Sequence, residues 1–269
     1  MRKMKNIDII KESFLFPIKN YKYFAIAIIL FLISEFSQEY FLHVKDSDIS
    51  MIIMMILSLI IPLLALGISL QIIFHLLDKK RGKPDISLHE SMKEALQDLI
   101  LESYYFLLAL IISAILAIPT GLFQKIDDIP TFMSDLMMAT EGTSVFEIMG
   151  SLPDLTMLDT LDSLKITLAI FIIIFVIMFS ICTIAKIDLN INEKYKQTFN
   201  VFHMLGIIKK IGISKYMGFL LLIVIISIFI ANIIYLLNSS HIIGSIISAF
   251  LEAFTLFFFL HSFAKLYPE

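Results

Sequence analysis

The residue most suited to chemistry is Glu252, an acidic residue inside a long apolar segment near the end of the chain. Ser245, Ser248 and Thr255 recur with it at steps of three and four, which places all four on one face of a helix. A carboxyl group inside a membrane must pair, hold a proton or meet water, so it is a functional-site hypothesis by default. The stripe predicts either a site for an ion or a proton, or hydrogen bonds that hold neighbouring helices together.

The preceding apolar segment carries polar residues at matching depth. Folding the two segments about the turn at 239–240 brings Ser227 near the depth of Glu252 and Asn232 near that of Ser248. We therefore expect a polar seam between these two helices.

A second polar stripe, Gln71, His75 and Asp78, lies at the end of another apolar segment. A His–Asp pair can serve metal or acid–base chemistry, but two ligands do not make a metal site. Side chains whose polar ends reach water at a membrane surface fit the stripe as well. His203 and His261 add ligands only if the fold brings them close. The sequence has no zinc-protease, phosphate-loop or nucleophile-elbow pattern, so we expect no catalytic residues, no metal site and no cofactor.

Composition identifies the class of protein. Apolar residues make up 58% of the 269 positions, and the mean hydropathy is +0.89. Soluble domains hold about 45–50% apolar residues, so this chain exceeds what a soluble fold buries. The 21 basic and 24 acidic residues nearly balance, which argues against a nucleic-acid-binding protein. Cys182 is the single cysteine, so an intrachain disulfide is excluded.

Six segments are long and apolar enough to cross a membrane, on the rule that ~20 residues span its hydrocarbon core. They cover residues 23–42, 51–77, 99–118, 166–185, 216–237 and 242–266. Acidic residues interrupt the far end of the first segment, which raises the alternative that it crosses only in part. The sequence therefore predicts an all-α integral membrane protein with a single membrane domain spanning residues 1–269 and an acidic outer loop at 121–164.

Amphipathic patterns precede three of the spans, at 7–21, 88–100 and 201–211. Apolar residues at helical spacing with charges opposite are typical of helices that lie in the membrane interface. Each pattern leads through a tyrosine into a pair of spans, so we predict three repeats of an interface helix and a helical hairpin. The alternative is that any hairpin preceded by a basic amphipathic segment looks alike.

The basic residues predict the orientation in the membrane. Eighteen of the 21 lie in the two termini and in the segments after spans two and four, and three lie on the other side. Because cytoplasmic loops are rich in lysine and arginine, both termini should be cytoplasmic, and the membrane is the cytoplasmic membrane of the cell. Basic residues beside the amphipathic segments should attract anionic lipid. The strongest candidates are Lys79, Lys80, Arg81, Lys83, Lys209 and Lys210.

Small residues predict where helices pack closely. Ala109, Ser113 and Ala117 line span three, and Gly244, Ser248, Ala249 and Ala253 line span six. Such faces let helices approach one another. We expect these two spans to be central in the fold or to contact a second protomer or a partner membrane protein.

Short matching pieces are distributed along the whole chain: residues 7–13 with Pro17, Gly67, Gly82 with Pro84, Phe202 with residues 208–212 and 215–216, and residues 264–267. In these the chain resembles a prokaryotic, largely archaeal, multi-pass membrane family, domain of unknown function 4013. It differs from the family in having Ile68 and Ile86 where the family has aromatic residues. The resemblance implies six spans and no established chemistry.

Two classes of function remain from the sequence. The first is a non-catalytic membrane component that organises lipid or a partner protein, which fits polar residues that serve packing. The second is a channel or transporter for an ion or small molecule that uses the polar seam around Glu252. A water-filled cavity that reaches Glu252 would favour the second.

Overall fold

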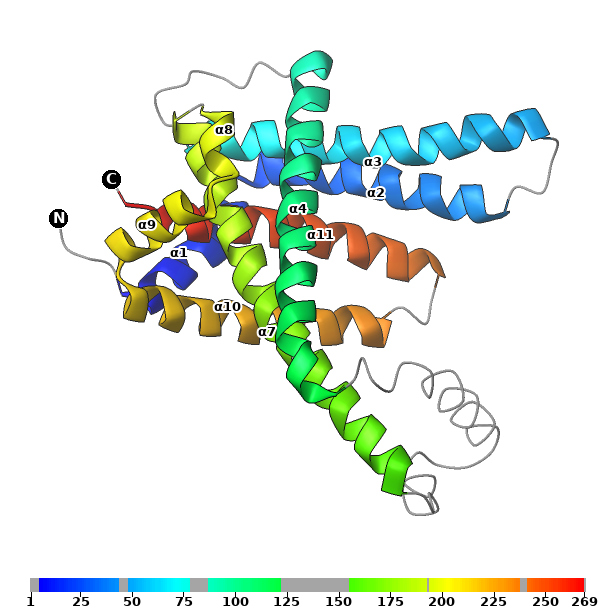
Figure 1. Cartoon of the computed structure of the whole chain (residues 1–269). Helices are drawn as coiled ribbons and strands as arrows, with labels where there is room; N and C mark the ends of the chain where they lie inside the picture. Colours follow the sequence, from blue (N-terminus) through cyan, green and yellow to red (C-terminus); the bar gives the residue numbers. More distant parts are fainter. Residues whose placement is uncertain are drawn as a thin grey trace. The chain divides into compact units, whose positions relative to one another are not determined.

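A computed structural model describes residues 5–43, 48–77, 87–121, 155–192, 194–237 and 241–268, and every element in these ranges is a helix. The elements, in chain order, are α1 (Asn6–Lys19), α2 (Tyr21–His43), α3 (Asp48–Leu77), α4 (Leu88–Ala117), η1 (Ile118–Thr120), α7 (Leu155–Asn192), α8 (Tyr195–Thr198), α9 (Val201–Ile211), α10 (Ile213–Leu237) and α11 (His241–Leu266). The arrangement is drawn in Figure 1.

Five of these helices are long and apolar enough to cross a membrane, and a sixth span results if α1 and α2 count together. The axes of α1 and α2 differ by 79°. The chain is therefore a multi-pass membrane protein, and each predicted span lies within one long helix, except that the last residue of span 99–118 belongs to η1. The predicted first span, within α2, counts as a membrane crossing only if the bent pair of α1 and α2 is taken as one span.

The structure corrects two predicted boundaries. The amphipathic segment 88–100 is not a separate helix, because α4 continues from Leu88 to Ala117. Residues 155–164 belong to α7 and not to an outer loop, and α7 also extends seven residues beyond the predicted end at 185. The rest of the acidic loop, residues 122–154, lies outside the described residues, as does the basic segment 78–86.

The two other amphipathic segments are separate helices. Asn20 separates α1 from α2, and Gly212, at φ +100°, separates α9 from α10. A side chain at Gly212 would strain a backbone conformation that glycine adopts freely. Of the three predicted copies of interface helix plus hairpin, the first and the third begin with a separate helix. The second does not, because its segment 88–100 is part of α4.

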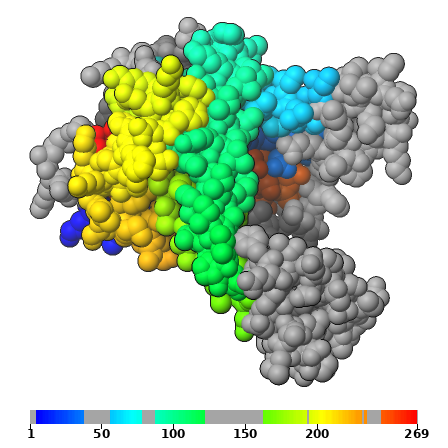
Figure 2. All heavy atoms as spheres, in the orientation of Figure 1, coloured from blue at the N-terminus to red at the C-terminus, as the bar shows by residue number. Residues whose placement is uncertain are grey.

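The chain divides into two compact units. Unit 1 comprises Met1–Glu102 with Ser180–Glu269, and unit 2 comprises Ser103–Phe179. In unit 1 helix α11 packs against α1, α2, α3 and α10. Figure 1 shows α2, α3 and α11 running alongside one another, and α8 and α9 lie on the surface in Figure 2.

Apolar and aromatic side chains form the core of unit 1. Phe24 contacts the rings of Phe250 and Phe257 with centroids 5.5 Å apart in both cases. Ala27 and Ala253, both fully buried, belong to the same cluster. The small-residue face of span six therefore packs against another helix of the same chain, and it lets α11 approach α2 closely.

Helix α11 is distant in sequence from α1, but the C-terminal end of α11 packs against that helix. Lys265 forms an ion pair of 3.1 Å with Glu12, and His261 Nδ1 lies 2.8 Å from the hydroxyl of Ser13. The first and last described helices of the chain thus meet at one end of unit 1.

The backbones of α3 and α4 approach each other closely at Gly67. A Cβ atom on Gly67 would lie 2.0 Å from the carbonyl oxygen of Ser91. The Ser91 hydroxyl donates a hydrogen bond of 2.8 Å to Gln71. A glycine at position 67 therefore fixes how closely the first turns of α4 approach α3.

Unit 2 is a helical pair with mainly apolar contacts. Phe106 packs edge-on against Phe175 with centroids 6.0 Å apart, and the hydroxyls of Thr120 and Thr167 lie 3.0 Å apart. The predicted small-residue face of span three is buried at Ala109, Ser113 and Ala117.

Candidate functional site

Two buried charges and a partly exposed one form an ion network between α4 and α7. The Lys186 ammonium lies 2.7 Å and 2.9 Å from the two carboxylate oxygens of Asp98. It also lies 2.6 Å from Glu102 Oε1. The side chains of Lys186 and Asp98 are only 10% and 6% exposed, whereas that of Glu102 is 43% exposed.

Local sequence explains how the network forms. Asp98 and Glu102 are four residues apart on α4, so both carboxylates lie on one helical face. Lys186 reaches that face from α7, which continues past the apolar segment because its charged side chains find partners inside unit 1. Removing two charges from water is costly, and mutual contact with full hydrogen bonding offsets that cost.

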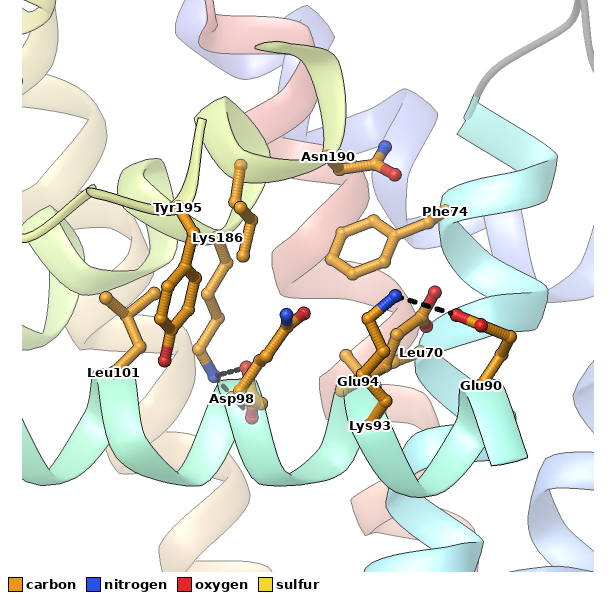
Figure 3. A pocket seen from close by; sticks show the side chains of 12 residues that line it. Leu70, Phe74, Glu90, Lys93, Glu94, Asp98, Leu101, Lys186, Asn190 and Tyr195 are labelled. Atoms are coloured by element: carbon orange, nitrogen blue, oxygen red, sulfur yellow. Dashed lines mark hydrogen bonds and ion pairs between the residues drawn. The ribbon is translucent and has the colours of Figure 1, made fainter. Parts of the chain in front are cut away.

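A cavity of about 410 Å³ opens above the network, as Figure 3 shows. The end of α3 supplies Leu70 and Phe74 as apolar walls. Leu101 and Leu189 add further apolar lining, and the polar side chains beside the network are Glu90, Lys93, Glu94, Gln97, Asn190 and Tyr195. Ligand pockets of ~300–1,000 Å³ with a few polar groups are typical binding sites, so this cavity is large enough for a small polar molecule.

The cavity contains paired and unpaired polar groups. Lys93 and Glu90 form an ion pair of 3.1 Å, in which both side chains are about half exposed. The buried hydroxyl of Tyr195 has no hydrogen-bond partner among the described residues. Burial raises the pKa of Tyr195, so this hydroxyl stays protonated and can donate to a molecule in the cavity.

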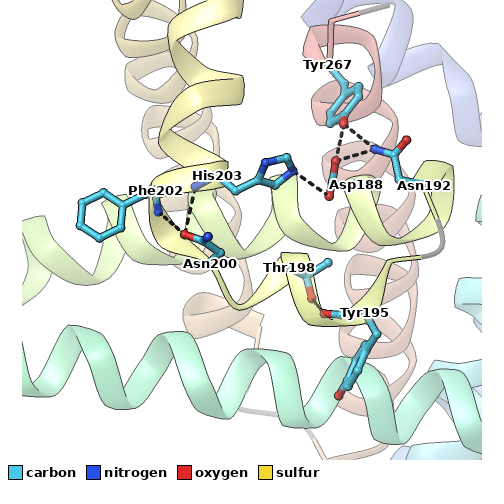
Figure 4. Close-up of polar contacts among 8 residues, drawn as sticks. All are labelled: Asp188, Asn192, Tyr195, Thr198, Asn200, Phe202, His203 and Tyr267. Carbon is cyan, nitrogen blue, oxygen red and sulfur yellow. Dashed lines mark hydrogen bonds and ion pairs between the residues drawn. The ribbon is translucent and has the colours of Figure 1, made fainter.

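A second polar cluster surrounds Asp188, two residues beyond Lys186 on α7 (Figure 4). The fully buried Asp188 carboxylate accepts hydrogen bonds from the Tyr267 hydroxyl and from Asn192 Nδ2, the latter at 2.8 Å. Its other oxygen lies 3.5 Å from His203 Nε2. Burial, together with the hydrogen bond to Asp188 and its charge, raises the pKa of Tyr267. The cluster therefore connects the C-terminal residues and α9 to α7.

Helix α9 is fixed at its start by Asn200. The Asn200 side-chain oxygen accepts from the backbone N–H groups of Phe202 and His203 at 3.0 Å and 3.2 Å. This is the usual capping arrangement that satisfies the first donors of a helix. It orients His203 toward Asp188.

Two residues of the predicted seam form hydrogen bonds within their own helix. Ser227 donates to the carbonyl of Ile223 at 2.9 Å, and Asn232 donates to that of Ile228 at 2.7 Å, so both side chains bond within α10. Glu252 belongs to none of the ion pairs formed among the described residues.

The other residues of the stripe lie on α11 with partial burial. Ser245, Ser248 and Thr255 are half-buried, whereas Glu252 is exposed on the surface of unit 1. Neither of the two cavities described for the chain includes Glu252.

The remaining predicted residues belong to separate contacts. His261 stacks on Phe16 with centroids 4.1 Å apart and contacts Ser13, whereas His203 lies beside Asp188. Among the described residues no three His, Cys, Asp or Glu side chains are grouped so that they could hold a metal ion.

The predicted basic residues are described only in part. Lys209 and Lys210 are exposed in the last turn of α9. Lys79, Lys80, Arg81 and Lys83, together with Asp78, lie outside the described residues.

The ion network is the feature that sequence reasoning missed. Its signal is present in the sequence: Asp98 and Glu102 precede an apolar segment on one helical face, and Lys186 ends another. Opposite charges at equivalent depth in two spans predict a pair, because an intramembrane charge requires a partner.

No family model, curated protein or solved structure matches this chain. Its function must therefore be inferred from its own residues.

Proposed function

We propose that this multi-pass membrane protein is a non-catalytic component of the cytoplasmic membrane that organises lipid at its surface. The observation that carries the proposal is helix α9. Its residues Met204, Ile207, Ile208 and Ile211 are buried against unit 1, while Phe202 is 85% exposed. An exposed aromatic residue on a short helix that also carries exposed basic side chains is typical of a helix at a membrane surface.

Two lysines complete this face. Lys209 and Lys210 are both exposed, in the last turn of the same helix. Near an anionic leaflet each basic residue contributes up to ~1 kcal/mol of attraction, which salt reduces. The combination favours contact between α9 and the headgroups of anionic lipids.

Helix α1 supports the same role. It buries Ile9, Ser13 and Phe16 but leaves Ile7 and Ile18 exposed. Lys11 and Lys19 are exposed on the same helix. Two short helices with apolar and basic exposed residues would gather lipid at one end of unit 1.

The buried polar groups also favour a non-catalytic role. Lys186, Asp98 and Asp188 are each engaged by other side chains of unit 1. Polar groups that satisfy one another hold helices together. A second protomer or a partner membrane protein would then bind to the outer surface of the protein in addition to lipid.

The proposal includes the orientation of the chain in the membrane and its membership of a family. The distribution of lysine and arginine supports cytoplasmic termini, and the meeting of α1 with the end of α11 supports termini on one side. The threefold repeat and membership of the domain of unknown function 4013 family rest on the sequence pieces given above.

Lipid retention tests the proposal. The protein is purified in mild detergent with equal phosphatidylcholine and phosphatidylglycerol, and bound lipids are counted by native mass spectrometry. Replacement of Lys209 and Lys210 by glutamine should lower the retained phosphatidylglycerol several-fold, with ~30-fold as the limit for two basic residues. The matched control is Lys165→Gln, an exposed lysine paired with Asp162 in unit 2. Equal retention by the double variant and the wild type would remove α9 as a lipid-binding element.

A second candidate, a channel or transporter for an ion or small molecule, has one specific observation in its favour. Glu252 is an acidic residue on a helix apolar enough to span, and none of the ion pairs among the described residues includes it.

A further inference from the structure

We propose that the groove between the start of α1 and the start of α10 binds one anionic phospholipid, whose phosphate group lies between Lys5 and Lys215. The site rests on the proposed lipid-organising role, and it names one place and one class of lipid for that role. It uses none of the residues of α9. Both helices belong to unit 1.

The groove has a volume of about 520 Å³ and lies where the two helices meet (Figure 1). The side-chain amide of Asn6 donates a hydrogen bond of 2.9 Å to the backbone carbonyl of Lys215. Because Lys5 precedes Asn6 in the chain, this bond holds the backbones of both lysines at one end of the groove. Ligand pockets of ~300–1,000 Å³ are typical, so the groove can hold a lipid headgroup with the start of its acyl chains.

Gly218 keeps the groove open. It is one of the lining residues, and a Cβ atom at this position would lie 3.2 Å from Asn6 Nδ2. A larger side chain would therefore press on the amide that joins the two helices and would fill the groove. The glycine leaves room for Asn6 and for a ligand.

The charged residues that line the groove are both lysines. Lys5 is exposed and Lys215 is half-buried, and neither belongs to an ion pair among the described residues. Lys5 directly precedes α1 and Lys215 lies in the first turn of α10, so the partial positive charges of two helix starts add to theirs. Asp8, in the first turn of α1, does not line the groove. The groove therefore favours an anion, and phosphate is a strong hydrogen-bond acceptor for lysine.

The other end of the groove is apolar, with Leu221, Leu222 and Ile7 as its lining. The two leucines lie six and seven residues beyond Lys215 on α10, or ~9–10 Å along the helix. The headgroup layer on each side of a bilayer is ~5–8 Å thick, and α10 is apolar enough to span from Ile213 to Ile230. When Lys215 lies at the depth of the lipid phosphates, Leu222 therefore lies among the acyl chains.

This order of groups fits a phospholipid better than a free phosphate ester. A free phosphate ester would leave the apolar half of the groove unused. A zwitterionic phospholipid carries a cationic group beside its phosphate, and two lysines would repel that group. The site therefore favours a lipid such as phosphatidylglycerol, whose headgroup has one negative charge and no cation.

A photoreactive lipid tests the site. The probe is phosphatidylglycerol with a diazirine near the start of one acyl chain, which releases N₂ on illumination and leaves a carbene that inserts into a nearby C–H bond. The full-length protein is reconstituted in phosphatidylcholine vesicles that contain a small fraction of the probe, and crosslinked peptides are quantified by mass spectrometry. We expect crosslinks at Leu221, Leu222 and Ile7. A phosphatidylcholine probe of the same design should crosslink there at least about fivefold less.

Two double variants separate a defined site from attraction to a basic surface. Replacing Lys5 and Lys215 by glutamine should lower crosslinking of the phosphatidylglycerol probe several-fold, with ~30-fold as the limit for two basic residues. The matched control replaces Lys194 and Lys196, two exposed lysines of unit 1 that do not line the groove. It removes the same charge and should leave crosslinking in the groove unchanged.

A third variant tests the shape of the groove without a change of charge. Gly218→Leu fills the groove beside Asn6, so it should also lower the crosslinks at Leu221 and Leu222 several-fold. Helical content and chromatographic behaviour confirm that each variant is folded.

Three results would overturn the proposal. An equal loss of crosslinking in the two double variants would mean that the probe responds to the basic surface and not to the groove. Equal crosslinking by the phosphatidylcholine probe would remove the selection for an anionic lipid. Displacement of the probe by glycerol phosphate, but not by sodium chloride at the same ionic strength, would make a soluble phosphate ester the ligand in place of a lipid.

The two lipid proposals can fail separately, because the retention assay on Lys209 and Lys210 reads α9 and not the groove. Reduced retention in that variant, with unaltered crosslinking after replacement of Lys5 and Lys215, would defeat the groove site alone. The reverse pair of results would defeat only the role of α9.

Discussion

Unit 1 holds carboxyl groups on spanning helices in two different settings. Asp98 and Glu102 meet the ammonium of Lys186, whereas Glu252 belongs to none of the ion pairs among the described residues. The first setting has charges of both signs and keeps them fixed. In the second setting the carboxyl group must hold a proton, form hydrogen bonds or meet water, because an isolated charge in a membrane is costly.

The largest expected effect comes from removing the cation of the ion network. Lys186→Met keeps the apolar stem of the side chain but leaves the Asp98 carboxylate buried without its partner. Breaking a buried pair in this way costs about 3–5 kcal/mol of unfolding free energy. Unfolding in mixed micelles by titration with dodecyl sulfate measures the loss.

The matched control uses a pair on the surface. Lys165→Met removes an ion pair with Asp162 in which both side chains are more than half exposed, so the change should be at most ~1 kcal/mol. Replacing Lys186 and Asp98 together by Met and Leu should recover most of the stability, because no unpaired charge remains. A Lys186→Met protein as stable as the wild type would contradict the structural role of the ion network.

A smaller effect is expected at the glycine that positions α4 and with it Asp98. The Cβ of Gly67→Ala would meet the backbone carbonyl of Ser91, which cannot move aside as a flexible side chain can. Overpacking of this kind costs ~1–3 kcal/mol. The control Gly206→Ala adds a Cβ to helix α9 where no atom lies within 4 Å, and it should be neutral or stabilising by up to ~1 kcal/mol.

The same unfolding titration distinguishes these two variants. Equal stability of both would mean that α4 can shift away from α3 without loss. Weaker burial of Lys186 in Gly67→Ala, seen as faster acylation by an amine-reactive reagent, would link this backbone contact to the ion network.

Helix positions could be predicted from the sequence because apolar length and periodicity are local properties. The bounds of α9 coincide with the predicted segment 201–211, since Asn200 caps its start and Gly212 ends it. The division of α4 at 100 was wrong for a related reason. A change from amphipathic to apolar sequence was read as a break, but no glycine or proline interrupts the helix there.

Partners across the fold could not be predicted in the same way. The depth of Glu252 follows from its place in the span, but which helix it faces depends on how α2 and α10 pack around α11. The sequence predicts α10 as the neighbour, and in the structure α11 packs against α1, α2 and α3 as well as α10. Likewise Lys186 was placed in a loop because it follows the last apolar residues, whereas its partner Asp98 keeps it inside the fold.

The smallest expected effect is at Glu252 itself, and it sharpens the contrast between the two settings. Glu252→Gln keeps a hydrogen-bonding group of the same size, so the unfolding free energy should change by less than ~1 kcal/mol. Glu252→Leu should cost about 1–2 kcal/mol, because it removes the hydrogen-bonding capacity of residue 252 on a spanning helix. The dodecyl sulfate titration used for Lys186→Met measures both, with Ser248→Ala as a control on the same helix. A loss in Glu252→Gln as large as that in Lys186→Met would mean that Glu252 is an ionised member of a fixed network. A small loss means that a hydrogen-bonding group of this size, and not a negative charge, is what unit 1 accommodates there.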